Sequence, residues 1–560
     1  MEDGGQAVLI GTGALPFLIL VSAVLTLPVA WLLLALYRRA VLRSMARPSG
    51  VAAVARAAGA PSGDSHALAH GRPLTPLRLE YLAPATGAAT APPAGMRRSL
   101  WALGSVHGVA GLVYALTLSG AWMHFAWAEG GFVLARFLWL LSCYAWPTVL
   151  SLGLVLAVTP AQRLAVGMAY FAMVLAFAAW ALARNPTLTA LDVAAFWLIT
   201  NLPATLLLLA FMHRRIRAVG PLVLAFMVAA VTGAQVAVAL AGSSEAALAA
   251  TVRVGGLLGL GGTATFYALL LAGAAVAALL GWAGLRWLGR RHLARRASDQ
   301  TLTLEAMWLL FAVVQTVSFA FEGVAWMLSG VVAFAAWKGV SQAGFRIAGL
   351  GRASGPAPSL LLLRVFALGA HSERLFDALG KRWLRIGNID LIAGPDLATS
   401  AVEPHEFLDF VGGRLSRQFV RDEDDLACRL QARALGPDPD GRHRVNEFFC
   451  HDDTWKPTML ALARSADAIL MDLRSFSPQH QGCRYELQQL LDFVPAAKLV
   501  LLVDARTDRR FMEATLETLW RQARTDSPNR RTGALRLQVI EDAGSRTLPA
   551  LLGALVRAAG

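Results

Sequence analysis

The sequence predicts two parts with different folds: a multi-span α-helical membrane domain, then an α/β domain with a doubly wound parallel sheet. Of the 560 residues, 56% are hydrophobic and only 16% are charged, and the mean hydropathy is +0.51. Long apolar runs lie before residue 346, and a mixed composition typical of a soluble domain follows. About 200 residues can bury a core of their own. We therefore expect a membrane domain at 1–345, a linker at 346–359 and a cytoplasmic domain at 360–560.

Apolar stretches of about 20 residues are long enough to cross a bilayer as helices. By this criterion the sequence predicts about nine spans, of which the last two are separated only by Glu322 and Gly323. The predicted spans cover residues 8–36, 101–126, 132–158, 163–183, 190–212, 220–241, 256–285, 304–321 and 324–343.

Basic residues set the expected orientation of these spans. Arginines fill the first loop, residues 38–98, and recur in alternate later loops, whereas the intervening loops carry few charges. Because loops rich in Lys and Arg stay on the cytoplasmic side, we expect a multi-pass protein of the cell inner membrane with its N-terminus outside and its C-terminal domain in the cytoplasm. The formal net charge of +14 is then explained by topology and by the lipid bilayer as partner, and no nucleic acid is expected.

The first loop is expected to be flexible. Residues 48–96 are rich in Ala, Pro, Gly and Ser with scattered arginines. Such a composition buries too little apolar surface to offset the entropy of ordering the chain.

A transport path requires polar groups inside the membrane spans, and few lie inside the predicted ones. The notable ones are His107, His124, Asn201, Gln235 and Gln315. Asn201-Leu202-Pro203 is typical either of a broken helix that lines a cavity or of a packing kink. A transporter with a regulatory cytoplasmic domain therefore stays an alternative interpretation.

The cytoplasmic domain alternates strands with helices, which indicates βαβ units and a parallel sheet. Strands are predicted at 360–368, 389–393, 468–473, 498–503 and 535–540, and helices at 373–385, 403–419, 455–465, 483–493, 509–524 and 548–559. Residues 424–450 are expected to be irregular or to form a hairpin. No GxGxxG motif follows any of these strands, so the usual dinucleotide fingerprint is absent.

A polar loop follows the buried strand at 468–473. Open α/β sheets bind ligands where the carboxyl ends of their strands meet the loops. The polar side chains expected there are Asp472, Arg474, Ser477, Arg484 and Glu486, with Glu486 on the first turn of the next helix. This pattern predicts a ligand crevice, in which the arginines bind phosphate. The alternative is that Glu486 complements the positive end of its helix and the arginines are solvated.

A second polar cluster precedes the helix at 455–465. Asn446, Glu447 and Asp452 either line the same crevice, or Asp452 and its neighbours cap the helix. A metal at His451 is not expected, because adjacent residues rarely supply a full ligand set. The four cysteines also lack the spacing of a zinc site or a disulfide framework.

The segment Ser477-Pro478-Gln479-His480-Gln481-Gly482-Cys483-Arg484-Tyr485-Glu486-Leu487 resembles the Toll/interleukin-receptor (TIR) domain family, whose corresponding segment reads Ser-Pro…Trp-Cys-x-x-Glu-Leu. The start of the domain, Leu363-Arg364-Val365-Phe366 and then His371-Ser372-Glu373, is also similar to the first strand and helix of that family. Gly482 stands where a TIR domain usually has Trp. The resemblance implies a flavodoxin- and TIR-like fold.

The stretch from Ala466-Asp467 to Glu486-Leu487 also resembles nucleoside deoxyribosyltransferase-like domains. In enzymatic members of both families the glutamate that matches Glu486 acts at an N-glycosidic bond. The two resemblances therefore imply Glu486 as the catalytic residue and NAD or a related nucleotide as the substrate, with no further cofactor and no metal. A carboxylate suits this chemistry because bond cleavage develops positive oxocarbenium charge.

The functional expectation combines these parts. A membrane-embedded sensor or anchor is coupled to a nucleotide-binding, TIR-like signalling domain that cleaves NAD and self-associates. The alternative from another class is a non-enzymatic scaffold at the membrane, in which Glu486 is structural.

Overall fold

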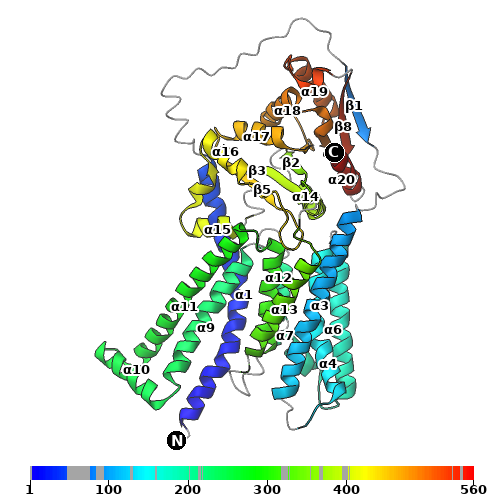
Figure 1. The fold of residues 1–560 in the computed structure, drawn as a ribbon. Coiled ribbons are helices and arrows are strands. Elements are labelled where there is room, and N and C mark those ends of the chain that lie inside the picture. Colours follow the sequence, from blue (N-terminus) through cyan, green and yellow to red (C-terminus); the bar gives the residue numbers. More distant parts are fainter. Residues whose placement is uncertain are drawn as a thin grey trace. The chain divides into compact units, whose positions relative to one another are not determined.

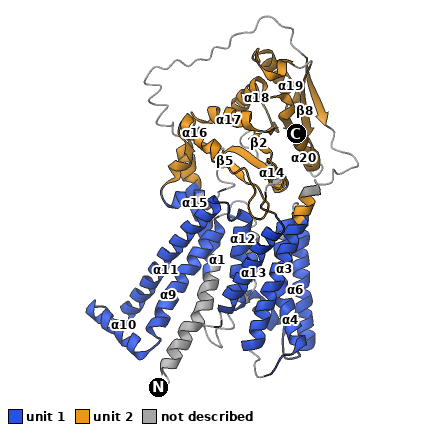
Figure 2. Cartoon of the chain, in the orientation of Figure 1, with its two compact units in different colours: residues 1–37, 101–349, 400–412 blue, residues 38–100, 350–399, 413–560 orange. Residues whose placement is uncertain are grey.

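The computed structural model describes residues 3–46, 76–82, 94–125, 130–157, 160–200, 202–211, 216, 219–316, 326, 328–352, 355–364, 370–393, 402, 404–531, 534–542 and 547–560. The chain divides into two compact units (Figure 2). Unit 1 comprises residues 1–37, 101–349 and 400–412, and unit 2 comprises residues 38–100, 350–399 and 413–560. Each unit thus takes segments from separate parts of the sequence.

Unit 1 consists of helices (Figure 1). Five helical stretches among the described residues are long and apolar enough to cross a membrane, and they indicate a membrane-associated protein. They are Val24–Met45 in α1 (Asp3–Met45), Met96–Phe125 in α3 (Ala94–Phe125), Ala161–Arg184 in α6 (Pro160–Arg184), Gly220–Ala241 in α9 (Gly220–Ala241) and Gly262–Leu293 in α11 (Gly262–Leu293). Helix α10 (Glu245–Leu257) precedes α11.

The structure does not support nine uninterrupted spans, because two of the predicted ones are broken, one is short, and one forms a helix that is not among the five candidate spans. The span at 132–158 is divided into α4 (Leu134–Ala145) and α5 (Pro147–Leu156), and that at 190–212 into α7 (Ala190–Thr200) and α8 (Leu202–Phe211). A proline lies in the first turn of α5 and of α8, where its missing N–H favours a helix start. The last two become α12 (Asp299–Gln315), of 17 residues, and α13 (Leu328–Ile347), which carries Lys338 and Arg346.

Unit 2 is built around an eight-stranded sheet in which every pairing is parallel, as the sequence predicts. The strand order is β1-β8-β7-β6-β2-β3-β5-β4. The strands are β1 (Leu77–Leu82), β2 (Ser359–Arg364), β3 (Asn388–Ala393), β4 (Phe419–Val420), β5 (Val445–Cys450), β6 (Ala468–Asp472), β7 (Leu499–Val503) and β8 (Leu535–Glu541). Strands β3-β2-β6-β7-β8 have the flavodoxin-like order of a doubly wound sheet.

Helices cover both faces of this sheet. Helices α14 (Ala370–Trp383) and α20 (Thr547–Ala558) form one buried core with the sheet, and α16 (Glu423–Gln431), α17 (Trp455–Ser465), α18 (Gln481–Phe493) and α19 (Arg509–Arg521) form the other. Along β6, Ala468 and Leu470 face the first core, and Ile469 and Met471 face the second. Burial on both faces explains why β6 is a continuous apolar run.

Strand β1 corrects the prediction of a flexible first loop. Residues 77–82 pair with β8 along six positions (Figure 1). The Tyr81 hydroxyl donates a hydrogen bond to Glu513 Oε1 at 3.0 Å, and Arg536 lies 3.4 Å from Glu80. Apolar and polar residues alternate in Leu-Arg-Leu-Glu-Tyr-Leu, which is a strand pattern that the composition of the whole loop concealed. Much of the predicted loop, residues 47–75 and 83–93, lies outside the described residues.

Between β3 and β6 the prediction was wrong in two places. The helix expected at 403–419 is α15 (Pro404–Val411), followed by a 3-10 turn at Leu415–Gln418 and by β4. It ends early because Gly413 has φ +70°, which favours glycine and stops the helix. Residues expected to be irregular instead form α16 and β5. Helix α15 belongs to unit 1, where Phe410 packs edge-on against Tyr37 with ring centroids 5.4 Å apart.

Candidate functional site

The point where the strand order reverses lies between β2 and β6. From β2 the chain continues to β3 on one side, and it later returns to β6, β7 and β8 on the other. Arg364 and Asp472 end these two strands and stand opposite each other in register. In doubly wound sheets this position, at the carboxyl ends of the strands, is where ligands bind.

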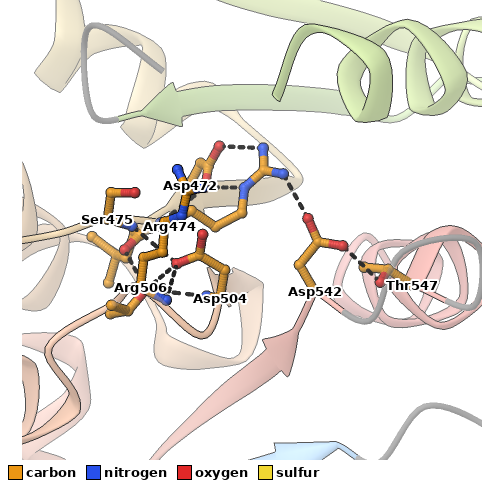
Figure 3. Close-up of polar contacts among 9 residues, drawn as sticks. Asp472, Arg474, Ser475, Asp504, Arg506, Asp542 and Thr547 are labelled. Atoms are coloured by element: carbon orange, nitrogen blue, oxygen red, sulfur yellow. Dashed lines mark hydrogen bonds and ion pairs between the residues drawn. The ribbon is translucent and has the colours of Figure 1, made fainter. Parts of the chain in front are cut away.

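A buried ion-pair network joins the ends of β6 and β8 (Figure 3). Arg474 Nε and Nη2 donate to the two carboxylate oxygens of Asp472 at 2.9 and 2.7 Å. Its Nη1 donates to Asp542 Oδ2 at 2.7 Å, and the Thr547 hydroxyl donates to Asp542 Oδ1 at 3.0 Å. The guanidinium also lies 5.5 Å from the centroid of the Phe376 ring. We call Asp472, Arg474 and Asp542 the acidic–arginine triad.

The loop after β6 is fastened to the loop after β7. Ser475 has φ +59°, which is rare for a residue with a side chain, and its amide donates to Asp504 Oδ1 at 3.1 Å. The same oxygen accepts from the amide of Arg506 at 3.2 Å (Figure 3) and lies 2.9 Å from the Thr507 hydroxyl. Asp504 therefore fixes the strained conformation that places Arg474 beside its partners.

Burial and charge pairing act in opposite directions within the triad. Burial raises the pKa of the Asp472 carboxyl, and the bond to Arg474 opposes that rise. Burial acts to lower the pKa of Arg474, but Asp472 and Asp542 together raise it. Both ions are almost fully inaccessible, with 0% of Asp472 and 1% of Arg474 exposed. Arg474, which is predicted to bind phosphate, donates to two carboxylates in this structure.

Glu486 has a different environment at the same edge of the sheet. Helix α18 begins at Gln481, two residues earlier than predicted, so Glu486 lies in its second turn rather than its first. The side chain is 3% exposed, and its Oε2 has no hydrogen-bond partner among the described residues. Burial raises the pKa of Glu486 to about 8. At neutral pH this carboxyl is therefore mainly protonated.

Cys483 connects Glu486 to the strand ends. It lies one turn before Glu486 on α18, and its thiol is 3.9 Å from the carbonyl oxygen of Arg364. Burial raises the pKa of Cys483, and both Glu486 and Asp472 add to that rise. Two carboxyls therefore affect the pKa of this thiol. Glu486 lies on α18, in the helix layer opposite to the one that carries Phe376 and Thr547, which contact the triad.

Ser477 and Arg484 lie in the loop and first turn that precede Glu486. Ser477 Oγ is 3.0 Å from His480 Nδ1, which orders the entry to α18. Arg484 Nη1 donates to Gln481 Oε1 at 3.4 Å, and its Nε has no hydrogen-bond partner among the described residues. Of the two arginines predicted to bind phosphate, Arg484 is the one with unused donors.

Asn446 and Asp452 are not brought together with Glu486. Asn446 is the second residue of β5 and donates to Asp390 Oδ1 at 2.8 Å. In the sheet register, Asp390 and then Leu361 connect Asn446 to Ile469 of β6. Asn446 is therefore three strands away from β6, level with a residue three positions before Asp472. Asp452 is exposed in the turn after β5.

Sequence reasoning missed Asp542, Asp504 and Thr507. Asp504 and Asp542 each directly follow a strand, at the ends of β7 and β8, and this position was the available signal. Among the described residues no group of three or more His, Cys, Asp or Glu side chains could hold a metal ion.

The arrangement offers one protonated, unpaired carboxyl and one partly available guanidinium near the point where the strand order reverses. The carboxyl can receive a cationic group, and the guanidinium can bind an anionic group. The two side chains are two positions apart on α18, so they lie on different faces of that helix. Comparisons of the chain with models of known protein families, with curated proteins and with solved structures gave no match.

Proposed function

We propose that the protein is a multi-pass protein of the cell inner membrane, with the N-terminus outside and the sheet unit in the cytoplasm. The pairing of β1 with β8 supports this orientation. Strand β1 lies between α1 and α3, so the loop after α1 must be on the same side of the membrane as the sheet. An even number of crossings then separates the two, which holds for totals of five and of nine. The arginines of the first loop make that side cytoplasmic.

We further propose that unit 2 is a TIR-like signalling domain that binds NAD or a related nucleotide and cleaves its N-glycosidic bond. The observation that carries this proposal is the buried Glu486 carboxyl, which lacks a partner for Oε2 and has its pKa raised to about 8. Buried polar groups are normally paired, and an exception with a perturbed pKa is typical of a functional site.

The chemistry follows from the missing partner. A cationic nicotinamide ring would place a positive charge near Glu486, which has no cationic partner in the described part of the chain. The oxocarbenium that forms as the bond breaks would then take the place of this charge. This charge lowers the pKa of the carboxyl, so the ionised form appears when substrate is bound. The carboxylate then stabilises the transition state by electrostatics while nicotinamide leaves and water adds to the anomeric carbon. Alternatively it attacks the anomeric carbon as nicotinamide leaves, and water hydrolyses the resulting ester. Arg484 would hold a phosphate.

Access to Glu486 requires rearrangement, because only 3% of the residue is exposed. We propose that self-association of the sheet units, under control of the membrane-embedded helices, favours the open form. This makes the domain inactive until it is clustered, as a signalling role requires.

The test uses the full-length protein in lipid nanodiscs, at high density on a support, with NAD and a measurement of nicotinamide release. Glu486→Gln should reduce the release at least 100-fold. The matched control is Glu541→Gln, because Glu541 is a half-exposed carboxylate at the end of β8 and should leave the rate unchanged. Equal release from Glu486→Gln and wild type would remove Glu486 as the catalytic residue. No release from folded, clustered wild type would favour the scaffold.

A further inference from the structure

The last turns of α11 and the turn that follows it carry a dense basic surface. Arg286, Arg290 and Arg296 are exposed and Arg291 is half-buried. Among the described residues none of these four forms an ion pair. The nearest acidic group that follows α11, Asp299, lies 3.9 Å from His292 Nε2. Within the part of the chain that the structure describes, these four arginines therefore have no carboxylate partner.

Two of these arginines are one helical turn apart. Residues at positions i and i+4 face the same way on a helix, so Arg286 and Arg290 repel each other unless an anion lies between them. The same spacing relates Trp287 to Arg291, whose guanidinium is 4.7 Å from the centroid of the indole ring. Trp287 is 50% exposed. Guanidinium pairs bind phosphate, and exposed tryptophans are enriched at the level of lipid headgroups.

Apolar surface continues directly from this basic surface toward the start of α11. Val276, Leu279 and Leu280 are 59%, 71% and 69% exposed, and the whole helix is a candidate membrane span. A free phosphate would use the arginines alone. A phospholipid would use the arginines, the indole ring and the apolar surface together, so the complementarity favours lipid.

We propose that the C-terminal turns of α11 form a binding site for an anionic phospholipid. Arg286 and Arg290 bind the phosphate, Trp287 and Arg291 lie at headgroup level, and the acyl chains lie along Val276, Leu279 and Leu280. This site is separate from Glu486 and does not depend on NAD cleavage.

The experiment measures thermal unfolding of the full-length protein in nanodiscs of phosphatidylcholine, with and without phosphatidylglycerol. Because a ligand that binds only the folded state stabilises it, phosphatidylglycerol should raise the wild-type midpoint by roughly 3 °C or more. The double variant Arg286→Gln/Arg290→Gln should lose most of this rise. The matched control Arg506→Gln/Arg510→Gln removes two exposed arginines with the same sequence spacing from unit 2 and should keep it.

Two results would overturn the proposal. One is a full rise in Arg286→Gln/Arg290→Gln. The other is an equal rise when inorganic phosphate is added to wild type in pure phosphatidylcholine, which would identify the anion as free phosphate. If the double variant does not fold, the single variant Arg290→Gln takes its place and should show an intermediate rise.

Discussion

Two buried acidic environments at the same edge of the sheet differ in one respect, which is pairing. In the acidic–arginine triad every carboxylate accepts a charged hydrogen bond, and the distances of Asp472 and Asp542 to Arg474 are all 2.7–2.9 Å. At Glu486, Oε2 has no partner and the carboxyl resists ionisation. The triad therefore fixes the ends of β6 and β8, whereas Glu486 Oε2 is left without a hydrogen-bond partner among the described residues.

This difference in pairing indicates which residues are candidates for function. A fully satisfied buried network holds structure, and its arginine is not available to a ligand. An unsatisfied buried carboxyl lowers stability, and such a cost is typical of a site kept for binding or catalysis. On this argument Arg474 is a positioning residue and Glu486 is the catalytic candidate.

Arg474→Met should have the largest effect on this comparison, because it turns the paired environment into an unpaired one. Two buried carboxylates would lose their shared cation, at a cost of about 3–5 kcal/mol. Hydrogen exchange of the amides of β6 and β8 in the full-length protein measures this loss. Arg521→Met, at a side chain 72% exposed, is the control and should change little. Unchanged exchange in Arg474→Met would show that the triad does not hold the strand ends.

Asp542→Asn should have a smaller effect. The amide oxygen still accepts from Arg474, but the charge is lost, so we expect a loss of about 1–2 kcal/mol in the same exchange measurement. Asp526→Asn removes a carboxylate from an exposed pair with Arg524 and should have almost no effect. A loss at Asp542→Asn as large as that at Arg474→Met would mean that the two hydrogen bonds to Asp472 do not hold Arg474 in place.

Ser475→Gly should have the smallest effect, with the opposite sign. Glycine relieves the left-handed backbone at φ +59° but gains entropy in the unfolded chain, so a net stabilisation of about 0.5 kcal/mol is expected. A denaturation midpoint compared with that of Ser475→Ala tests this. A destabilised glycine variant would mean that the entropy that glycine adds to the unfolded chain outweighs the backbone strain that it relieves.

In unit 2, the helices and strands with a strong local pattern were predicted more accurately than the segments between them. Helix α17 has the predicted bounds, and β6 ends one residue early, because the apolar run of β6 and the periodicity of α17 are local signals. Strand β1 was missed since its partner β8 is more than 450 residues away in the chain. Five of the nine predicted spans overlap helices that are long and apolar enough to cross a membrane. The breaks before Pro147 and near Pro203 divide two of the others.

The candidate site was predictable in residue type but not in environment. The polar run after β6 identified Asp472, Arg474 and Glu486. The second carboxylate that pairs with Arg474 is Asp542, 68 positions away, and no local pattern reveals that contact. In the same way the burial of Glu486 depends on the packing of α18 on the sheet, which its sequence alone does not fix.

The most direct test of the account is the unfolding free energy of wild type and Glu486→Gln across pH. Because the folded pKa of Glu486 is about 8 against an ordinary 4.5, the unfolded chain loses this proton first as pH rises. Wild type should therefore lose about 1.4 kcal/mol per pH unit relative to Glu486→Gln between these two values. The variants should agree near pH 4.5 and differ by on the order of 4 kcal/mol at pH 8. Parallel curves over this range would show that Glu486 is paired or solvated, and would contradict the account.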